Sequence, residues 1–391
     1  MTTTLEMTVA PSLDRLVLPD GLGSEVLVVP GELLVRHRDL TAPAVRRFAT
    51  AHGLRAGLVP GLDGRVVRFT GPALRTHLAE VLADAARRGV PVTAHHVAPM
   101  AGYIKALDGP RPMGRGHIKA LSGPLPTSGG PRFRPESSAP CVVAVLDTGV
   151  DARPRGDGWL AGVSGDADPT DTLAAGTGHG TFVAGLVQQV APAATVRAYR
   201  VMDPDGAGSD ARVAAAMLRA ADDGADVLNL SLGTRTIGDE PPIAFEAALG
   251  LLAERHPGTL VVAAAGNDGE DRPCWPAAFP DVAAVAGLTA ASAPSPWSNH
   301  GDWVECSAVA EDVVSTFVEG HRAISGGRPA AFGADPWASW TGTSFAAPQV
   351  AAAVAAHSAE HGTTPRESLA ALLAGRPAAD GYGAVLEILP G

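Results

Sequence analysis

The stretch Val142-Val143-Ala144-Val145-Leu146-Asp147 is a short, continuously apolar run that ends in a carboxylate. Similar apolar runs follow, and helix-like segments lie between several of them. The runs are residues 196–201, 227–230, 260–264 and 282–286, and the helix-like segments include residues 211–222 and 243–254. This alternation is typical of a parallel sheet that is covered on both faces. The sequence therefore predicts an α/β fold for residues 140–391.

Polar residues lie at the carboxyl ends of predicted strands, which is where ligands bind in such sheets. Asp147 and Asn267 fall at or just past predicted strand ends. His179 lies in Gly178-His179-Gly180-Thr181, and Ser344 lies directly ahead of an Ala-rich, helix-forming stretch. The order Asp, His, Ser is one of the chain orders known for serine triads.

These residue types can form a nucleophilic site. A serine hydroxyl becomes a nucleophile only beside a base and an oxyanion site. Asp147 would orient His179, and His179 would take the proton from Ser344. The side-chain amide of Asn267 and the backbone N–H of Ser344 would bind the oxyanion, and one such donor is worth about 3 kcal/mol.

Each of these residues also has an ordinary interpretation, as a turn residue, a loop histidine or a helix start. Four of them together in this order favour catalysis. The Gly-x-Ser-x-Gly elbow of α/β-hydrolases is absent, because position 346 is Ala.

Four segments carry a family resemblance: residues 145–151, 178–185, 264–267 and 342–351. They resemble the motifs of the subtilisin-like serine proteases, or subtilases, over about residues 140–360. The resemblance implies a three-layer α/β/α fold with a mainly parallel sheet, and a substrate backbone held as a strand between two segments. The matching substrate-binding residues are Gly206, Ala207 and Gly208 in one segment and Ser231, Leu232 and Gly233 in the other.

The resemblance also implies that Ala264, Ala265 and Gly266 line the first specificity pocket. Small residues there would leave room for a sizeable apolar side chain. Close packing of strands is an additional role that small residues can have at these positions.

The N-terminal part is predicted to be a separate unit. Residues 1–25 read as a tail, and residues 26–100 have the order β-α-β-β-α-β, which suits a small α+β, ferredoxin-like domain. Residues 101–139 form a Gly- and Pro-rich linker in which residues 102–110 return as residues 116–124. That repeat is either duplicated linker sequence, which we favour, or a docking or cleavage segment.

Many subtilases carry an N-terminal propeptide that assists folding and inhibits the enzyme, and the resemblance implies the same role here. The alternative is an unrelated N-terminal domain. Residues 1–140 contain 17 Lys and Arg against 11 Asp and Glu, whereas residues 141–391 contain 13 against 30. The two parts should therefore attract each other.

Some segments depart from the family pattern. Many secreted members insert a calcium-binding loop where this chain has only residues 186–190, and calcium needs six to eight oxygen ligands. We therefore predict no high-affinity calcium site there and no cofactor. The acidic clusters Asp166/Asp168/Asp171 and Asp203/Asp205 could bind calcium weakly, but solvated loop charge is the favoured interpretation. The segment 319–337 is a candidate flap near the site.

Composition excludes several functional classes. The net charge of −11 argues against nucleic acid as a partner. The sequence contains no uninterrupted run of about 18 apolar residues, so no membrane span is expected. The first thirty residues show no secretory signal, so a cytoplasmic location is expected, with non-classical export as the alternative. Cys141, Cys274 and Cys306 are too sparse for a disulfide framework and read as buried hydrophobic residues.

The sequence therefore predicts a serine endopeptidase that is held inactive by its own N-terminal domain. Its substrate would be a peptide in extended conformation, and it could be a dedicated maturation protease for one precursor. The alternative is a catalytically silent, subtilase-like peptide-binding protein.

Overall fold

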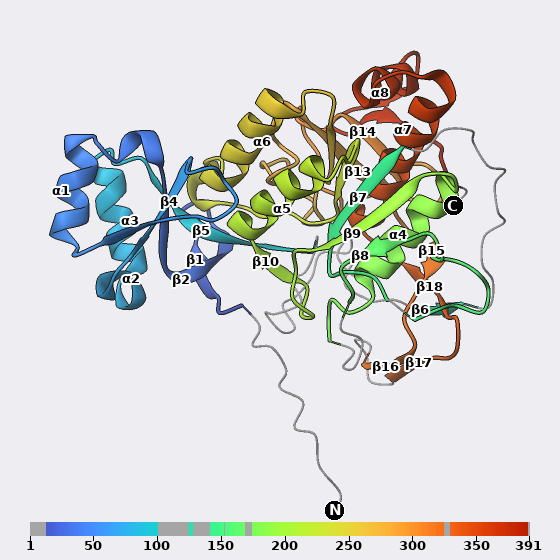
Figure 1. Cartoon of the computed structure of the whole chain (residues 1–391), viewed down its shortest axis with the longest axis horizontal. Coiled ribbons are helices and arrows are strands. Elements are labelled where there is room, and N and C mark those ends of the chain that lie inside the picture. Colours follow the sequence, from blue (N-terminus) through green and yellow to red (C-terminus); the bar gives the residue numbers. More distant parts are fainter. Residues whose placement is uncertain are drawn as a thin grey trace, which may run out of the picture.

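The computed structural model describes residues 13–100, 125–127, 141–151, 153–168, 174–323 and 329–389. The repeat in the predicted linker and Asp171 lie outside these residues. A small N-terminal unit and a larger α/β unit lie side by side, as Figure 1 shows.

The larger unit is built on a twisted sheet of nine strands in the described residues, in the order β19-β20-β14-β13-β12-β11-β7-β9-β8. All neighbouring pairs are parallel except β19 with β20. The strands are β7 (Val142–Asp147), β8 (Ser164–Gly165), β9 (Thr195–Arg200), β11 (Val227–Leu230), β12 (Leu260–Ala264), β13 (Val282–Leu288), β14 (Cys306–Val309), β19 (Ala378–Ala379) and β20 (Gly383–Val385).

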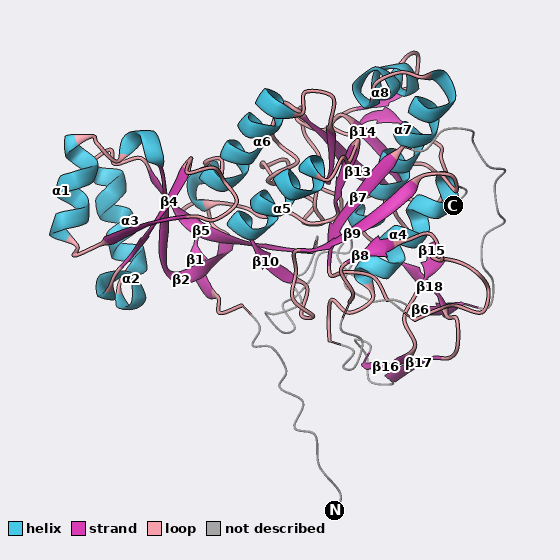
Figure 2. Ribbon diagram, in the orientation of Figure 1, coloured by secondary structure: helices cyan, strands magenta, loops and turns pink. Residues whose placement is uncertain are grey.

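Helices cover both faces of this sheet, because successive side chains of a strand point to opposite faces (Figure 2). Val143 and Val145 of β7 pack in one core with helices α4 (His179–Val190) and α7 (Ala347–His361). Ala144 and Leu146 pack in the other core with α5 (Asp210–Asp222) and α6 (Ile243–Arg255). Helix α8 (Pro365–Leu373) packs on α7. The predicted α/β/α layering is confirmed.

The N-terminal unit has the element order β2 (Glu25–Arg36), α1 (Pro43–Ala51), β3 (Arg55–Leu58), β4 (Val66–Thr70), α2 (Pro72–Thr76) with α3 (Leu78–Arg87), and β5 (Val92–Pro99). Its antiparallel strands lie in the order β5-β2-β4-β3. This agrees with the predicted β-α-β-β-α-β order. The helices bury Val45, Phe48 and Leu78 against the sheet.

One local prediction was wrong. The predicted tail of residues 1–25 contains strand β1 (Leu16–Pro19), which pairs with β2. Helix α1 begins at Pro43, and its N-cap residue Ala42 makes no side-chain hydrogen bond. The pairing of β2 with β5 shifts register between Val28 and Leu33.

Short elements complete the larger unit. Strand β18 (Trp337–Trp340) pairs with β15 (Val313–Thr316) and with β6 (Leu125–Thr127) of the predicted linker. The candidate flap contains the hairpin β16 (Gly320–Ala323) and β17 (Pro329–Phe332). One-turn helices are η1 (His37–Asp39), η3 (Ile237–Asp239) and η4 (Thr343–Phe345).

The two units share a core and several ion pairs. Leu34, Val59 and Leu62 of the N-terminal unit pack in the same cluster as side chains of α5 and α6. Arginines of the N-terminal unit meet carboxylates of the larger unit at Arg15–Asp205, Arg36–Glu246 and Arg65–Glu254, and Asp63 meets Arg255. The charge asymmetry of the sequence is therefore expressed as direct contacts between the units.

Candidate active site

The predicted catalytic residues come from four separate elements. Asp147 is the last residue of β7, and His179 is the first residue of α4. Ser344 lies in η4, directly ahead of α7, and Asn267 follows β12. All four are buried in the described structure. The parallel sheet gathers them at the carboxyl ends of its central strands, as the sequence pattern predicts.

Asp147 and His179 are in direct contact. Nδ1 of His179 lies 2.8 Å from Oδ1 and 2.9 Å from Oδ2 of Asp147. The backbone N–H of Thr148 donates to the same Oδ1 at 2.7 Å. Gly178 holds φ at 83°, a conformation that favours glycine, at the point where the chain turns into α4. A carboxylate on Nδ1 leaves Nε2 as the ring nitrogen that can accept a proton.

Aromatic rings enclose the imidazole of His179. The ring of Trp340 stands edge-on to it, with centroids 5.4 Å apart, and the ring of Phe345 lies at the same centroid distance. Such packing limits the motion of the imidazole and excludes water from its faces.

Ser344 is held by a reciprocal contact with Ser231. Its hydroxyl donates to the carbonyl oxygen of Ser231 at 3.0 Å, and the hydroxyl of Ser231 donates to the carbonyl oxygen of Ser344 at 2.7 Å. In the described structure, the Ser344 hydroxyl is therefore directed to Ser231 rather than to His179. Catalytic hydrogen bonds are often long or misaligned in free enzymes and tighten when substrate binds.

Asn267 is oriented by Thr343, the neighbour of Ser344. Its Oδ1 accepts from the backbone N–H and from the hydroxyl of Thr343, both at 2.9 Å. A Cβ atom at Gly342 would lie 3.4 Å from Nδ2 of Asn267. Since the oxygen of the amide is engaged, the nitrogen is the group that Asn267 can offer to an oxyanion.

The two predicted substrate-binding segments enclose a strand of the chain itself. Strand β10 (Ala207–Ser209) pairs antiparallel with the end of β5, with Ala207 opposite Pro99 and Gly208 opposite Ala98. The N–H of Met100 donates to the carbonyl oxygen of Gly206 at 2.8 Å. On the other side, the N–H of Gly233 donates to the carbonyl oxygen of Pro99 at 3.1 Å, and Met100 forms a bridge with Leu232.

Residues 97–100 of the N-terminal unit therefore lie between the segments 206–209 and 231–233. Met100 lies opposite Leu232, which is the chain neighbour of Ser231. The carbonyl oxygen of Ser231 accepts from the Ser344 hydroxyl. We call this stretch, residues 97–100, the inserted segment.

A buried thiol lies beside the predicted first pocket. Sγ of Cys274 lies 2.6 Å from the place of a Cβ at Gly233 and 3.3 Å from that of a Cβ at Gly266. Cys274 is buried, and burial, together with the charge of Asp268, raises the pKa of its thiol to about 12. The thiol is therefore a neutral, apolar group between Gly233 of a predicted substrate-binding segment and Gly266 of the predicted pocket.

Ala264 and Ala265 differ in role. Ala264 is fully buried in the core on the α4 and α7 face, as the close-packing interpretation expects. The carbonyl oxygen of Ala265 accepts from Nδ2 of Asn299, and that of Gly266 accepts from the N–H of Asn299, both at 2.9 Å. Asn299 therefore fixes the backbone ahead of Asn267.

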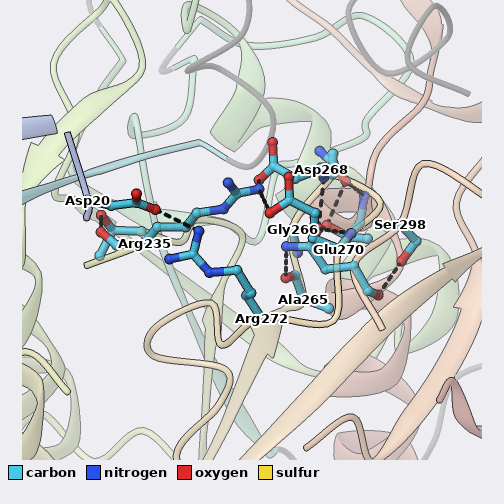
Figure 3. A network of polar contacts seen from close by, with 12 residues as sticks. Asp20, Arg235, Ala265, Gly266, Asp268, Glu270, Arg272 and Ser298 are labelled. Carbon is cyan, nitrogen blue, oxygen red and sulfur yellow. Dashed lines mark hydrogen bonds and ion pairs between the residues drawn. The ribbon is translucent and has the colours of Figure 1, made fainter. Parts of the chain in front are cut away.

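Two arginines, Arg235 and Arg272, lie near Ala265 and Gly266 (Figure 3). Arg235 is buried and pairs with Asp268 at 3.0 Å and with Glu270 at 2.8 Å. Arg272 pairs with Asp239 at 2.7 Å and, at 2.6 Å, with Asp20 of the N-terminal unit. The network thus joins the backbone around the predicted pocket to the docked N-terminal unit.

The acidic clusters considered for calcium are engaged with the protein itself. Asp166 pairs with Arg219 at 2.8 Å, and Asp203 pairs with Arg212 at 2.9 Å. Helix α4 runs without interruption through residues 186–190, where many family members have an inserted loop. Among the described residues, no group of three or more His, Cys, Asp or Glu side chains is placed to hold a metal ion.

Some residues of the site could not be identified from the sequence. Met100 and Pro99 carry no chemical signal, and only their place at the end of a strand ahead of a linker could have suggested an inserted segment. Cys274 reads as an ordinary buried thiol, because Gly233, the glycine nearest to its Sγ, is far away in the chain. All three cysteines are buried and unpaired, as predicted.

No described helix has the length and apolar character that crossing a membrane requires.

Comparison with known proteins gives consistent results. Residues 139–381 match the family model of the subtilase family, Peptidase_S8. A thermophilic serine proteinase of Bacillus sp. (strain AK1) is 35% identical over 224 residues, which are 54% of this chain and 50% of that protein. The chain thus spans about half the length of this curated relative.

Solved structures share the fold. Fervidolysin from Fervidobacterium pennivorans, a keratinolytic enzyme related to subtilisin, aligns with a TM-score of 0.62 and 20% identity, covering 92% of this chain and 60% of that one. The prenylagaramide maturation protease PagA aligns with a TM-score of 0.51 and 24% identity, covering 65% of this chain and 92% of that one. The motifs, the layered fold and the family match agree: the chain belongs to the subtilase family of subtilisin-like serine proteases.

Proposed function

We propose that this protein is a serine endopeptidase that cleaves peptide bonds through Asp147, His179 and Ser344. The observation that carries the proposal is the buried contact of both Asp147 carboxylate oxygens with Nδ1 of His179. A carboxylate in this place fixes the tautomer of the imidazole and stabilises the imidazolium that forms during attack.

The reaction would follow the acyl-enzyme route. The Ser344 hydroxyl turns from the carbonyl oxygen of Ser231 towards Nε2 of His179, which takes its proton while Oγ attacks the scissile carbonyl carbon. The tetrahedral intermediate collapses when His179 gives that proton to the leaving amine. Water, deprotonated by His179, then hydrolyses the ester at Ser344.

Asn267 would stabilise the intermediate. Its Nδ2 carries the N–H groups that can donate to an oxyanion, and the contacts of Thr343 with Oδ1 orient the amide. Replacing one oxyanion donor typically costs a factor of about 100 to 1,000 in kcat. The Asn267→Leu variant should show this loss with a nearly unchanged KM.

The test of the activity is the hydrolysis of an extended peptide by the processed protein, which is the protein freed of its N-terminal unit, and by its Ser344→Ala variant. We expect hydrolysis by the parent protein, with the variant at least about 1,000-fold slower. A parent protein that binds the peptide as tightly as the variant and cleaves it no faster would support the alternative, a catalytically silent peptide-binding protein.

We further propose that the N-terminal unit inhibits the enzyme by filling the substrate cleft. The inserted segment makes the main-chain hydrogen bonds that an extended peptide would make with residues 206–209 and 231–233, as in strand addition to an exposed sheet edge. A substrate and the inserted segment cannot occupy these bonds together.

This inhibition can be measured directly. Residues 1–100, added in trans to the processed enzyme, should suppress hydrolysis, and more strongly at low salt because the two units carry opposite charges. Equal rates with and without the added unit would contradict the inhibitory role but would leave the proposed activity intact.

A narrow substrate range is supported by the pocket. Cys274 reduces the space between Gly233 and Gly266, so residues with small side chains should be preferred ahead of the scissile bond. Such a preference would suit maturation of one precursor. A proteome digest with no strong side-chain preference would count against a dedicated maturation role.

A further inference from the structure

Asp168 is a buried carboxylate close to the candidate triad, and the proposed reaction does not use it directly. Only 4% of its surface is exposed. Its backbone N–H donates to the carbonyl oxygen of Val150 at 3.0 Å, which ties its loop to the segment that follows β7. A buried, unpaired carboxylate is costly, so its presence calls for a physical explanation.

The contacts of Asp168 converge on the two residues that flank His179. Its Oδ2 accepts from the backbone N–H of Gly178 at 2.7 Å and from the hydroxyl of Thr148 at 3.1 Å. The same hydroxyl accepts from the backbone N–H of Gly180 at 3.1 Å. The peptide groups before and after His179 are therefore held, directly or through Thr148, by one carboxylate oxygen.

The network also reaches Asp147. Thr148 is its chain neighbour, and the backbone N–H of Thr148 donates to Oδ1 of Asp147 at 2.7 Å. Thr148 thus bonds to Asp147 through its main chain and to Asp168 through its side chain. The relative position of Asp147 and His179 depends on this bridge.

We propose that Asp168 is a positioning residue for the Asp147–His179 pair, which fixes the backbone on both sides of His179 and adds negative charge near Asp147. This inference rests on the proposed function, because positioning matters only if His179 transfers protons. Displacement of a reacting group by about 1 Å can cost a factor of about 100 in rate.

The surroundings of Asp168 support a functional rather than a stabilising role. Its Oδ1 is buried and has no hydrogen-bond partner among the described residues. Burial, with a smaller effect of the charge of Asp147, raises the pKa of Asp168 to about 7, against the lowering effect of Gly178 and Thr148. A neutral side chain at this position would cost less free energy on folding.

The charged groups that act on Asp168 are Asp147, which raises its pKa, and Arg200, which lowers it. At pH values above about 7, ionised Asp168 adds to the field of Asp147 and favours the imidazolium that forms in the transition state. Below that pH, Asp168 retains its hydrogen bonds as a neutral acid but loses this effect.

The first test compares Asp168→Asn and Asp168→Ala with the parent enzyme, in kcat and KM from pH 5.5 to 9. Asparagine keeps an oxygen that accepts both hydrogen bonds but carries no charge. We expect parent-like kcat at pH 5.5 and about a threefold to tenfold lower kcat at pH 9 for this variant. Alanine should lower kcat by about 100-fold at every pH, with less than a threefold change in KM.

Asp166→Asn is the matched control, because Asp166 lies two residues away and pairs with Arg219 near the surface. It should behave like the parent enzyme at all pH values. An Asp168→Asn profile that coincides with the parent profile would overturn the charge effect. An unchanged kcat in Asp168→Ala, or an equal loss in Asp166→Asn, would overturn the proposal as a whole.

A second measurement separates this proposal from the proposed activity. Hydrogen exchange of the Gly178 and Gly180 amides reports their hydrogen bonds. This measurement does not depend on catalysis, so it can be made in the Ser344→Ala protein. Exchange should be at least about tenfold faster when Asp168→Ala is added and nearly unchanged with Asp168→Asn. If exchange responds in this way but the parent protein does not hydrolyse peptides, the proposed activity fails and the positioning network stands. Unchanged exchange in Asp168→Ala would contradict the network itself.

Discussion

At the scale of single residues, the structure changes the expectation for the first pocket. Ala264, Ala265 and Gly266 suggest a roomy pocket, but the thiol of Cys274 lies close to Gly233 and Gly266. We therefore expect the size of the pocket to depend on a residue outside the segment 264–266 that predicts the pocket. A wider pocket would need a change at Cys274 rather than in that segment.

The variant Cys274→Gly should widen the pocket. We expect kcat/KM for peptides with Phe ahead of the scissile bond to rise by about tenfold or more relative to peptides with Ala, since one methylene group in a hydrophobic pocket is worth about 1–3 kcal/mol. Paired peptides that differ only at this residue measure the ratio. Cys141→Ala, at the opposite end of β7 from Asp147, should leave it unchanged; a changed ratio there, or none in Cys274→Gly, would contradict the assignment.

Asp168 has a consequence for stability that is opposite to its effect on activity. Its folded-state pKa of about 7 lies above the ordinary 3.8, so its ionised form is disfavoured in the fold. Its contribution to stability is present at low pH and is lost as pH rises through about 7. Asp168→Asn should therefore raise the melting temperature at pH 8.5 but not at pH 4, as thermal unfolding would show. A lower melting temperature at pH 8.5 would contradict this.

The candidate triad could be predicted from the sequence, because Asp147, His179 and Ser344 stand in long local motifs. Cys274 and Met100 could not be assigned roles in the same way. Their importance depends on neighbours that the fold brings from far along the chain, and nothing in the local sequence reports those neighbours.

At the scale of elements, the strand at the end of the N-terminal unit is the most informative feature. Strand β5 begins inside the small sheet beside β2 and ends beside β10 of the larger unit. One strand therefore joins the two units. Its final residues lie where an extended substrate is expected.

Gly206→Ala should weaken this strand contact. Gly206 has φ of 83°, and a Cβ there would lie 2.9 Å from Sδ of Met100. We expect inhibition by the N-terminal unit in trans to weaken by roughly tenfold, or about 1.4 kcal/mol. Inhibition constants measured with one peptide substrate give this value.

Gly224→Ala is the matched control, because Gly224 has a similar φ of 87° but no atom within 4 Å of a Cβ there. It should lower stability without changing inhibition. Equal inhibition constants for Gly206→Ala and the parent enzyme would contradict the position of the inserted segment beside Gly206.

The buried elements could largely be predicted from the sequence. The runs at residues 227–230 and 260–264 form strands with the predicted bounds, because all their side chains are buried and their composition is continuously apolar. Strand β1 was missed because the short apolar run Leu16-Val17-Leu18 has no period-two alternation, and only Leu18 of the three is buried. Its pairing with β2 arises from the fold and not from its own pattern.

At the scale of the whole molecule, docking of the N-terminal unit depends on ion pairs of unequal burial. The carboxylate of Asp20 is fully buried and is held by Arg272. Burial raises the pKa of Asp20, but the N–H groups of Leu22 and Ser24 and the guanidinium of Arg272 lower it by more. Its contribution is therefore present above its ordinary pKa and is lost as pH falls through the lowered value.

Asp20→Asn should weaken docking, because it removes one of the two carboxylates that pair with Arg272 and leaves Asp239 as the other. We expect a loss of about 2 kcal/mol, or roughly thirtyfold in the inhibition constant, which is the range for a hydrogen bond between charged groups. The pair Arg65–Glu254 is about half exposed on both sides, so Glu254→Gln should cost under about 1 kcal/mol. Similar losses for the two variants would contradict the expectation that the more buried ion pair contributes more to docking.

The central claim is that Ser344 is an activated nucleophile to which the N-terminal unit controls access. The most direct measurement is labelling with a fluorophosphonate probe, followed by peptide mass spectrometry, on the full chain and on the protein freed of its N-terminal unit. We predict a single adduct on Ser344 that forms much faster in the freed protein and is absent from His179→Ala. No adduct on Ser344 in the freed protein, or equal labelling in His179→Ala, would contradict the account.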